Sequence, residues 1–141
     1  MKRIVEIADL NLEQDQVISI SFVGPKTIMR INKQFVNHTG LTDVIAFDYR
    51  NEDQSPNNDI AAELIIHPGM ARLAASRRKH SFFAYEMTLY LLHGVLHILG
   101  ENDLTPKART KMRRTERKIM KKLQDEFSLE SIFQSNIQEK L

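Results

Sequence analysis

Residues 89–103 read LYLLHGVLHILGEND, and this stretch decides both the central helix of the fold and its most distinctive chemistry. Its apolar residues follow one another almost without a break, which predicts a helix over 82–99 that is buried on most sides. His93 and His97 are four residues apart, so on such a helix their imidazoles lie one turn apart on the same face.

The residues after the second histidine extend the pattern to H-x3-H-x2-G-x2-D. Gly100 predicts the end of the helix, because glycine readily adopts the left-handed conformation of a helix C-terminus. A turn after Gly100 can bring Asp103 back toward His93 and His97. Two imidazole nitrogens and one carboxylate then form a three-ligand site with open positions for water and substrate. We therefore expect a single catalytic metal ion at these three residues.

The alternative is an ordinary pair of core histidines. Burying two imidazoles without partners costs on the order of 1–3 kcal/mol each, which a metal ion or carboxylate partners would remove. Gly94, between the histidines, costs about 1 kcal/mol relative to alanine in a helix, so we expect another element or a substrate to pass close to it. Zinc proteases with this histidine spacing carry their general-base glutamate where Gly94 stands here. The pattern therefore favours phosphodiester hydrolysis over proteolysis.

The 141 residues suffice for one globular domain over 1–141, with 128–141 expected to form a frayed tail. The absence of cysteine rules out disulfides and thiolate ligands, and we expect a cytoplasmic protein. No apolar run approaches the roughly 20 residues of a membrane span, and no signal peptide or membrane partner is expected.

Strand-like and helix-like segments alternate irregularly, which predicts an α+β fold with a mixed sheet of about four strands, helices packed on it and the metal-binding helix in the core. Ser81 and Thr105 are the expected caps of the last two helices. A polar loop, NEDQSPNND, is the expected mobile stretch. The expected strands are 2–9, 16–23, 42–49 and 60–66, and the expected helices are 27–36, 68–78, 82–99 and 106–127.

The segment 105–122 contains nine Lys or Arg residues and one acid, Glu116. Charge runs of this kind usually form a solvated helix face. With a metal site next to it, however, the segment becomes a candidate RNA-contacting face. At helical spacing its cations form two exposed rows, one of Arg113, Arg117 and Lys121 and the other of Arg114, Lys118 and Lys122.

Several motifs of the chain resemble those of the YbeY family of bacterial single-strand-specific endoribonucleases. HGVLHILG (93–100) is similar to the family's HGxLHLxG, TDVIAF (42–47) to its PT(D/N)VLSF strand and AELII (62–66) to its GDIVI strand. The resemblance implies a metal-dependent hydrolase that acts as an endonuclease in ribosomal RNA maturation and ribosome quality control. It also implies one bound zinc ion, ribosomal RNA as partner, and a phosphate contact at His38.

The chain also departs from the family pattern. The family's third histidine ligand is Asp103 here, and a set of two histidines and one carboxylate also suits other divalent transition metals. The family's arginine in the turn before the TDVIAF strand is Val36. Two alternatives therefore remain beside the endoribonuclease, with no catalytic residue beyond the ligands assigned. One is a non-catalytic metal-stabilised RNA- or ribosome-binding protein, and the other is a metallohydrolase of another class.

Overall fold

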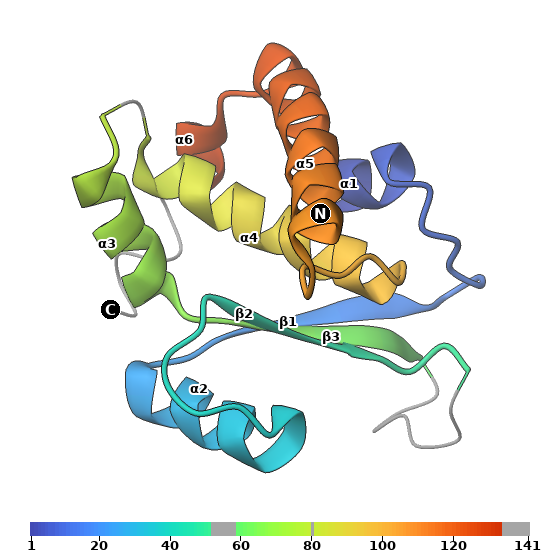
Figure 1. Cartoon of the computed structure of the whole chain (residues 1–141). Helices are drawn as coiled ribbons and strands as arrows, with labels where there is room; N and C mark the ends of the chain where they lie inside the picture. Colours follow the sequence, from blue (N-terminus) through green and yellow to red (C-terminus); the bar gives the residue numbers. More distant parts are fainter. Residues whose placement is uncertain (52–58, 80, 134–141) are drawn as a thin grey trace.

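The computed structural model describes residues 1–51, 59–79 and 81–133, which form a three-stranded mixed sheet with helices on both faces (Figure 1). The strands are β1 (Val17–Phe22), β2 (Val44–Asp48) and β3 (Ile60–Ile66), in the order β1-β3-β2. β1 runs parallel to the central β3, and β2 runs antiparallel to it. The α+β class and the mixed sheet predicted from the sequence are confirmed, with three strands in the described residues rather than about four.

Helices account for most of the remaining described residues. Among them, α4 is the helix predicted around the histidine pair, and none has the length and hydropathy of a membrane span. The helical elements are α1 (Lys2–Ile7), α2 (Pro25–Ile31), the π-helical turn η1 (Asn32–Val36), α3 (Pro68–Arg77), α4 (Phe83–Ile98), α5 (Pro106–Glu126) and α6 (Leu129–Phe133).

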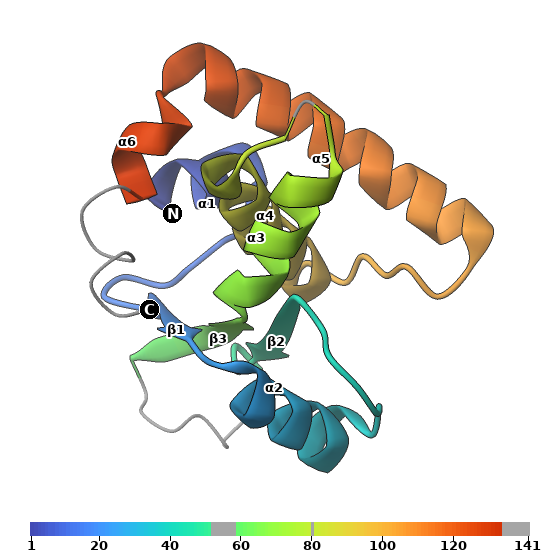
Figure 2. The same ribbon diagram turned by 90° about the vertical axis from the view of Figure 1, so that its left-hand side faces the viewer.

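The two faces of the sheet are covered differently. Alternate residues of the strands, such as Ile45 and Ile65, pack against Ile28 of α2 on one face. Val44 and Leu64 face the other way and belong to the main core with α4. Figure 2 shows this layering, with α2 on one side of the sheet, α4 on the other, and α5 lying across the outer side of α4. The central helix is thus enclosed between the sheet and α5, which confirms its predicted place in the core.

The predicted strand over 2–9 is wrong, because this segment forms α1. The β-branched residues of this segment favour a strand. In the described residues, however, each edge strand, β1 and β2, pairs only with the central β3, and residues 2–9 join neither edge. Helical spacing instead places Ile4 in the main core, and Arg3 pairs with Glu6 one turn later and with Glu126 of α5. Tertiary packing therefore outweighs the local β propensity.

Two predicted caps have different outcomes. Thr105 caps α5, since its hydroxyl accepts a hydrogen bond from the Ala108 amide at 3.1 Å. Ser81 does not cap α4, because Phe82 is the N-cap residue and the Ser81 hydroxyl donates to Glu86 instead. The tail over 128–141 is predicted from the sequence to fray, but its first part forms α6 as far as residue 133. Leu129 of α6 is buried. Residues 134–141 and most of the polar loop, 52–58, lie outside the described residues.

Candidate metal centre

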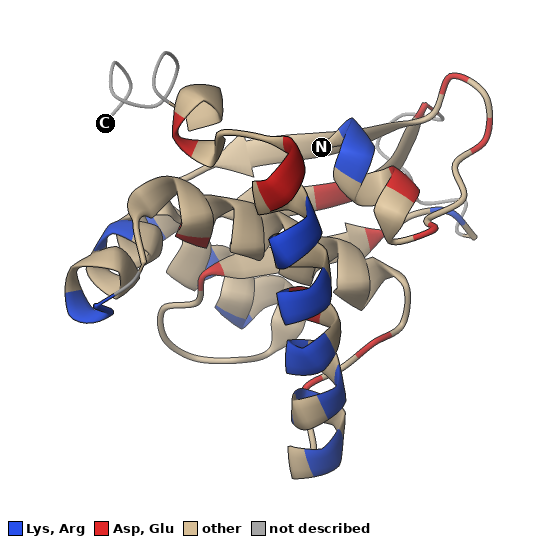
Figure 3. Ribbon diagram, turned by 90° about the horizontal axis from the view of Figure 1, so that it is seen from above, with Lys and Arg blue, Asp and Glu red and all other residues tan. Residues whose placement is uncertain are grey.

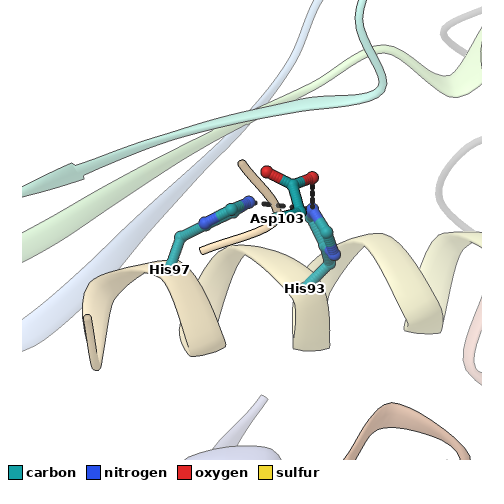
Figure 4. A group of neighbouring side chains, drawn as sticks. All are labelled: His93, His97 and Asp103. Atoms are coloured by element: carbon teal, nitrogen blue, oxygen red, sulfur yellow. Dashed lines mark hydrogen bonds and ion pairs between the residues drawn. The ribbon is translucent and has the colours of Figure 1, made fainter. Parts of the chain in front are cut away.

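The imidazoles of His93 and His97 lie on one face of α4 and point their Nε2 atoms at each other (Figure 4). The two Nε2 atoms are 2.8 Å apart, and the rings are nearly perpendicular, at 89°. A carboxylate oxygen of Asp103 lies 3.8 Å from the Nε2 of His93. One ligand atom from each of the three residues lies within 4.8 Å of the others. The three residues that the sequence singles out therefore form one convergent group.

The turn after α4 brings Asp103 to this group. Gly100 has a φ of 91°, and the amides of Gly100 and Glu101 donate to the carbonyls of His97 and Leu96 at 2.9 and 3.0 Å. This double hydrogen bond is a Schellman motif, which ends the helix and reverses the chain. The loop then runs through Asp103 to the cap of α5. The predicted role of Gly100 is confirmed by its left-handed conformation.

The second nitrogen of each imidazole is held by a separate acceptor. His97 Nδ1 donates to the Glu101 carbonyl at 3.0 Å, and His93 Nδ1 donates to the Glu116 carboxylate at 2.5 Å. Because Nδ1 carries the proton in both rings, each neutral ring has a lone pair on Nε2. Two lone pairs that face each other at 2.8 Å need a cation between or beside them, either a proton or a metal ion.

The electrostatics around His93 favour positive charge. Burial by itself would lower the pKa of His93. The hydrogen bond to Glu116 and the negative charges of Glu116, Asp43 and Asp103 outweigh burial, so the pKa is raised above its ordinary value. The carboxylates that raise this pKa would also stabilise a divalent cation bound to Nε2 of His93.

The donor set fits a divalent transition metal. Two neutral imidazoles and one carboxylate are ligands of catalytic zinc sites, and hydrogen bonds that fix the tautomer of each ligating histidine are the usual outer support of such sites. The Asp103 side chain is 46% exposed and that of His93 is 21% exposed, so the group is reachable from solvent. The described residues thus contain a possible metal site, and its ligands leave the identity of the metal open.

Gly94 explains how α4 approaches the sheet so closely. A Cβ atom at this position would lie 2.7 Å from Leu64 Cδ2 and 3.3 Å from Val44 Cγ2. The close approach expected from the sequence is therefore made by side chains of β3 and β2. A larger residue here would have to displace the Leu64 and Val44 side chains, and the chain carries glycine where a zinc protease carries its general-base glutamate.

The other residues named from the sequence lie outside the three-ligand group. The cations of α5 are exposed, and Figure 3 shows Lys and Arg positions along most of the length of this helix. His38 is exposed in the loop after η1. The rows predicted on the exposed face of α5 consist of Arg113, Arg114, Arg117, Lys118, Lys121 and Lys122.

The role of Glu116 is not predicted from the sequence. This side chain is only 11% exposed, although its helix is strongly basic. Its position carries a signal, because Met112, Glu116, Ile119 and Leu123 follow each other at helical spacing and the other three are buried. An acid within an apolar stripe indicates a buried partner, which here is His93.

The family model and the curated proteins that match this chain carry the same description. The model of the family described as "Endoribonuclease YbeY" matches residues 1–124. Curated proteins with that name include one from Elusimicrobium minutum, 35% identical over 67% of this chain and 66% of its own length. Those from Thermodesulfovibrio yellowstonii and Parabacteroides distasonis are each 31% identical, over 76% and 77% of this chain. The alignments cover 67% and 72% of these two relatives, so the chain matches about two thirds of the relatives' length.

Proposed function

The chain belongs to the YbeY family of endoribonucleases, and on this premise we propose that it is a metal-dependent, single-strand-specific endoribonuclease that acts in ribosomal RNA maturation and ribosome quality control. The observation that carries the proposal is the pair of Nε2 atoms 2.8 Å apart, with a carboxylate beside them and an acceptor behind each ring. Its place of action would be the cytoplasm, where ribosomal RNA is the partner.

His93, His97 and Asp103 would hold one ion, and zinc is the ion that we propose. When bound, the ion would supply Lewis acidity toward the scissile phosphate and toward the attacking water. Glu116 fixes the orientation of His93, and the Glu101 carbonyl fixes that of His97. This support keeps both nitrogens directed at one point without reorganisation during the reaction.

The substrate class follows from the charge beside the site. The exposed cations of α5 (Arg113, Arg114, Arg117, Lys118 and Lys121) would contact the phosphate backbone and give salt-dependent binding. His38 is a further proposed phosphate contact. Glycine at position 94, where a zinc protease carries its general-base glutamate, supports a nuclease over a peptidase.

The test combines elemental analysis of the purified protein with an RNA cleavage assay. We expect about one equivalent of zinc per chain and cleavage of single-stranded ribosomal RNA fragments, both lost in His97→Ala. Asp125→Asn on α5 is a control outside the site. Protein without tightly bound metal, or unchanged cleavage by His97→Ala, contradicts the proposal.

A non-catalytic RNA-binding protein is the second candidate, and Val36 motivates it, because the family carries an arginine at this position. It predicts metal content and RNA binding without cleavage under any divalent metal. RNA binding that survives chelation, combined with the absence of product, would select this candidate over the nuclease.

A further inference from the structure

A cleft of about 390 Å³ lies directly beside the metal centre, between the end of α3, one face of α4 and the inner edge of α5. His93 and its partner Glu116 line one part of this cleft. Glu86 lines another part, seven residues earlier on α4, which is about 10 Å along the helix. The cleft therefore runs from the ligand pair toward the start of α4.

Six charged side chains line the cleft, and the carboxylates among them already have partners. These residues are Asp43, Arg77, Arg78, Glu86, Arg113 and Glu116. Asp43 accepts from the Val44 amide and the Thr42 hydroxyl, and Glu116 accepts from His93. Arg77 and Arg113 form no ion pair within the described ranges. The cleft therefore has two cations available for an anion, one on α3 and one on α5.

The third cation of the cleft, Arg78, is held in place by the buried carboxylate of Glu86. Glu86 is 1% exposed, and its Oε1 accepts from Arg78 Nη1 at 3.0 Å and from the Ser81 hydroxyl at 2.7 Å. Its Oε2 is also buried and has no hydrogen-bond partner in the described part of the chain. A desolvated carboxylate of this kind binds its one cation strongly, since separating the two would leave an uncompensated buried charge.

The Arg78 side chain nevertheless remains 62% exposed. A guanidinium carries five N–H donors in a rigid plane, and Glu86 uses one nitrogen of the group. The remaining donors have no acceptor among the residues that the structure describes, so they are available to a ligand in the cleft that Arg78 lines. Glu86 thus acts as a positioning residue that fixes the direction of those donors.

We propose that this cleft is a phosphate-binding subsite, in which Arg77 and Arg78 from the α3 side and Arg113 from α5 clamp an RNA phosphate neighbouring the one at the metal centre. This inference rests on the proposed nuclease function. It predicts the course of a bound RNA strand across the protein. Of the five α5 cations predicted to contact RNA, Arg113 alone lines the cleft. The strand passes between α3 and α5, and the outer rows of α5 contribute to long-range attraction.

The probe for the test is a fluorescently labelled hexamer of 2′-O-methyluridine, which keeps the phosphates and is checked by gel to stay intact. Its binding to the metal-loaded full-length protein is measured by anisotropy at several salt concentrations. Arg78→Met and Arg113→Met each weaken binding about tenfold, the size of one charge-assisted hydrogen bond, and each lowers the salt slope by about one.

Arg72→Met is the matched control, because it removes a cation from α3, the helix that Arg78 follows as its C-cap residue. Arg72 stacks on the Phe83 ring at 5.4 Å and does not line the cleft. The control binds the hexamer within about twofold of the wild type. Equal losses for Arg72→Met and Arg78→Met, or no loss in Arg78→Met and Arg113→Met, overturn the proposal.

The role of Glu86 is tested by a double-mutant cycle. Glu86→Gln removes a negative charge from the cleft, so general electrostatics predicts tighter binding of the hexamer, whereas positioning predicts weaker binding. The weakening disappears in the Arg78→Met background, because Glu86 acts through Arg78. Tighter binding, or the same loss in both backgrounds, overturns this role. If Arg78→Met does not fold, as judged by circular dichroism, Arg78→Lys replaces it and shows a smaller loss.

The cleavage assay separates this inference from the proposed function. Arginine-dependent hexamer binding without cleavage of any RNA keeps the subsite and rejects the nuclease. Cleavage that is insensitive to Arg77, Arg78 and Arg113 keeps the nuclease and rejects the subsite.

Discussion

At the scale of single residues, the chemistry of the site depends on which nitrogen of each histidine is occupied. Glu116 and the Glu101 carbonyl take the Nδ1 protons of His93 and His97, which leaves both Nε2 lone pairs for one cation. The acceptors differ, since the Glu116 carboxylate is charged and the Glu101 carbonyl belongs to the backbone. Only the support of His93 can therefore be removed by substitution.

Replacing Glu116 with glutamine tests that support. The amide oxygen still accepts from His93 Nδ1, but the negative charge that favours a cation is lost. Metal affinity falls about 10–100-fold, as for other outer-shell carboxylates. Competition with a chromogenic chelator at pH 8 measures it, with Asp125→Asn as a surface-carboxylate control on the same helix. An affinity equal to that of the wild type would show that Glu116 has only a packing role.

The sequence predicts the three ligands but not this partner. Helical periodicity brings His93 and His97 together, and Gly100 predicts the return of the chain toward Asp103. Glu116 reaches His93 only because α5 lies across α4, and no local pattern encodes that crossing. The sequence indicates a basic cluster of Arg72, Arg77, Arg78 and Lys79 as a candidate phosphate contact. It does not show that Arg77 and Arg78 share a cleft with Arg113, because that cleft joins three separate elements.

At the scale of secondary-structure elements, contacts across the sheet decide where α4 lies. Leu64 and Val44 pack into the space that Gly94 leaves, so β3 and β2 are set close to the face that carries the histidines. The same priority of tertiary contacts explains why residues 2–7 form a helix. Local propensity predicted β1, β2 and β3 correctly, because their apolar residues are also buried in the folded protein.

Gly94→Ala tests the close approach of α4 and β3. In an open helix this change stabilises by about 1 kcal/mol, but here the new methyl group meets the fully buried Leu64. Overpacking of about 1–3 kcal/mol exceeds the gain in helix propensity, so the free energy of unfolding decreases. Urea denaturation measures the change, and Leu64→Ala in the same chain removes the penalty of Gly94→Ala. A stabilised single variant would contradict the packing argument.

Arg50 joins the end of β2 to the end of α4. Its guanidinium makes two hydrogen bonds of 2.9 Å to Asp48, and its Nη2 donates to the Ile98 carbonyl at 2.8 Å. Arg50→Met lowers the free energy of unfolding by about 1 kcal/mol, a modest value because both side chains are partly exposed. The exposed Arg30 on α2 provides the control, as Arg30→Met.

The loss in Arg50→Met depends on pH in a defined direction. The hydrogen bond from Arg50 lowers the pKa of Asp48 below its ordinary value. A lowered pKa stabilises the fold above the ordinary pKa of aspartate, and this contribution disappears as the pH falls through the lowered value. The difference in unfolding free energy between wild type and Arg50→Met is therefore constant near neutrality and shrinks below about pH 4. Urea denaturation across pH 3–7 measures it, and a difference that grows on acidification would refute the pairing.

At the scale of the whole molecule, the candidate metal centre joins parts of the chain that are otherwise only packed together. Its ligands come from α4 and from the loop before α5, and the partner of His93 comes from α5 itself. A bound ion would therefore stabilise the position of α5 as well as the site.

Removal of the metal tests this coupling. A ligand that binds only the folded state at about 1,000 times its Kd stabilises by about 4 kcal/mol. A chelator is therefore expected to lower the Tm of the wild type by about 10 °C. His97→Ala already melts at the lower temperature and does not respond to the chelator. A wild-type Tm that is the same with and without the chelator would show that the site does not contribute to stability.

The position of Asp103 has a consequence for how this protein can change over evolutionary time. The histidine pair is fixed in α4, most of whose residues are buried, whereas the Asp103 side chain is 46% exposed in the loop between the Schellman turn and the Thr105 cap. Substitutions at 102–104 therefore meet few steric constraints. A library randomised over these three positions should yield folded variants with altered metal preference, while one randomised at 93–97 should yield mostly unfolded protein. The third ligand is the evolvable part of the site.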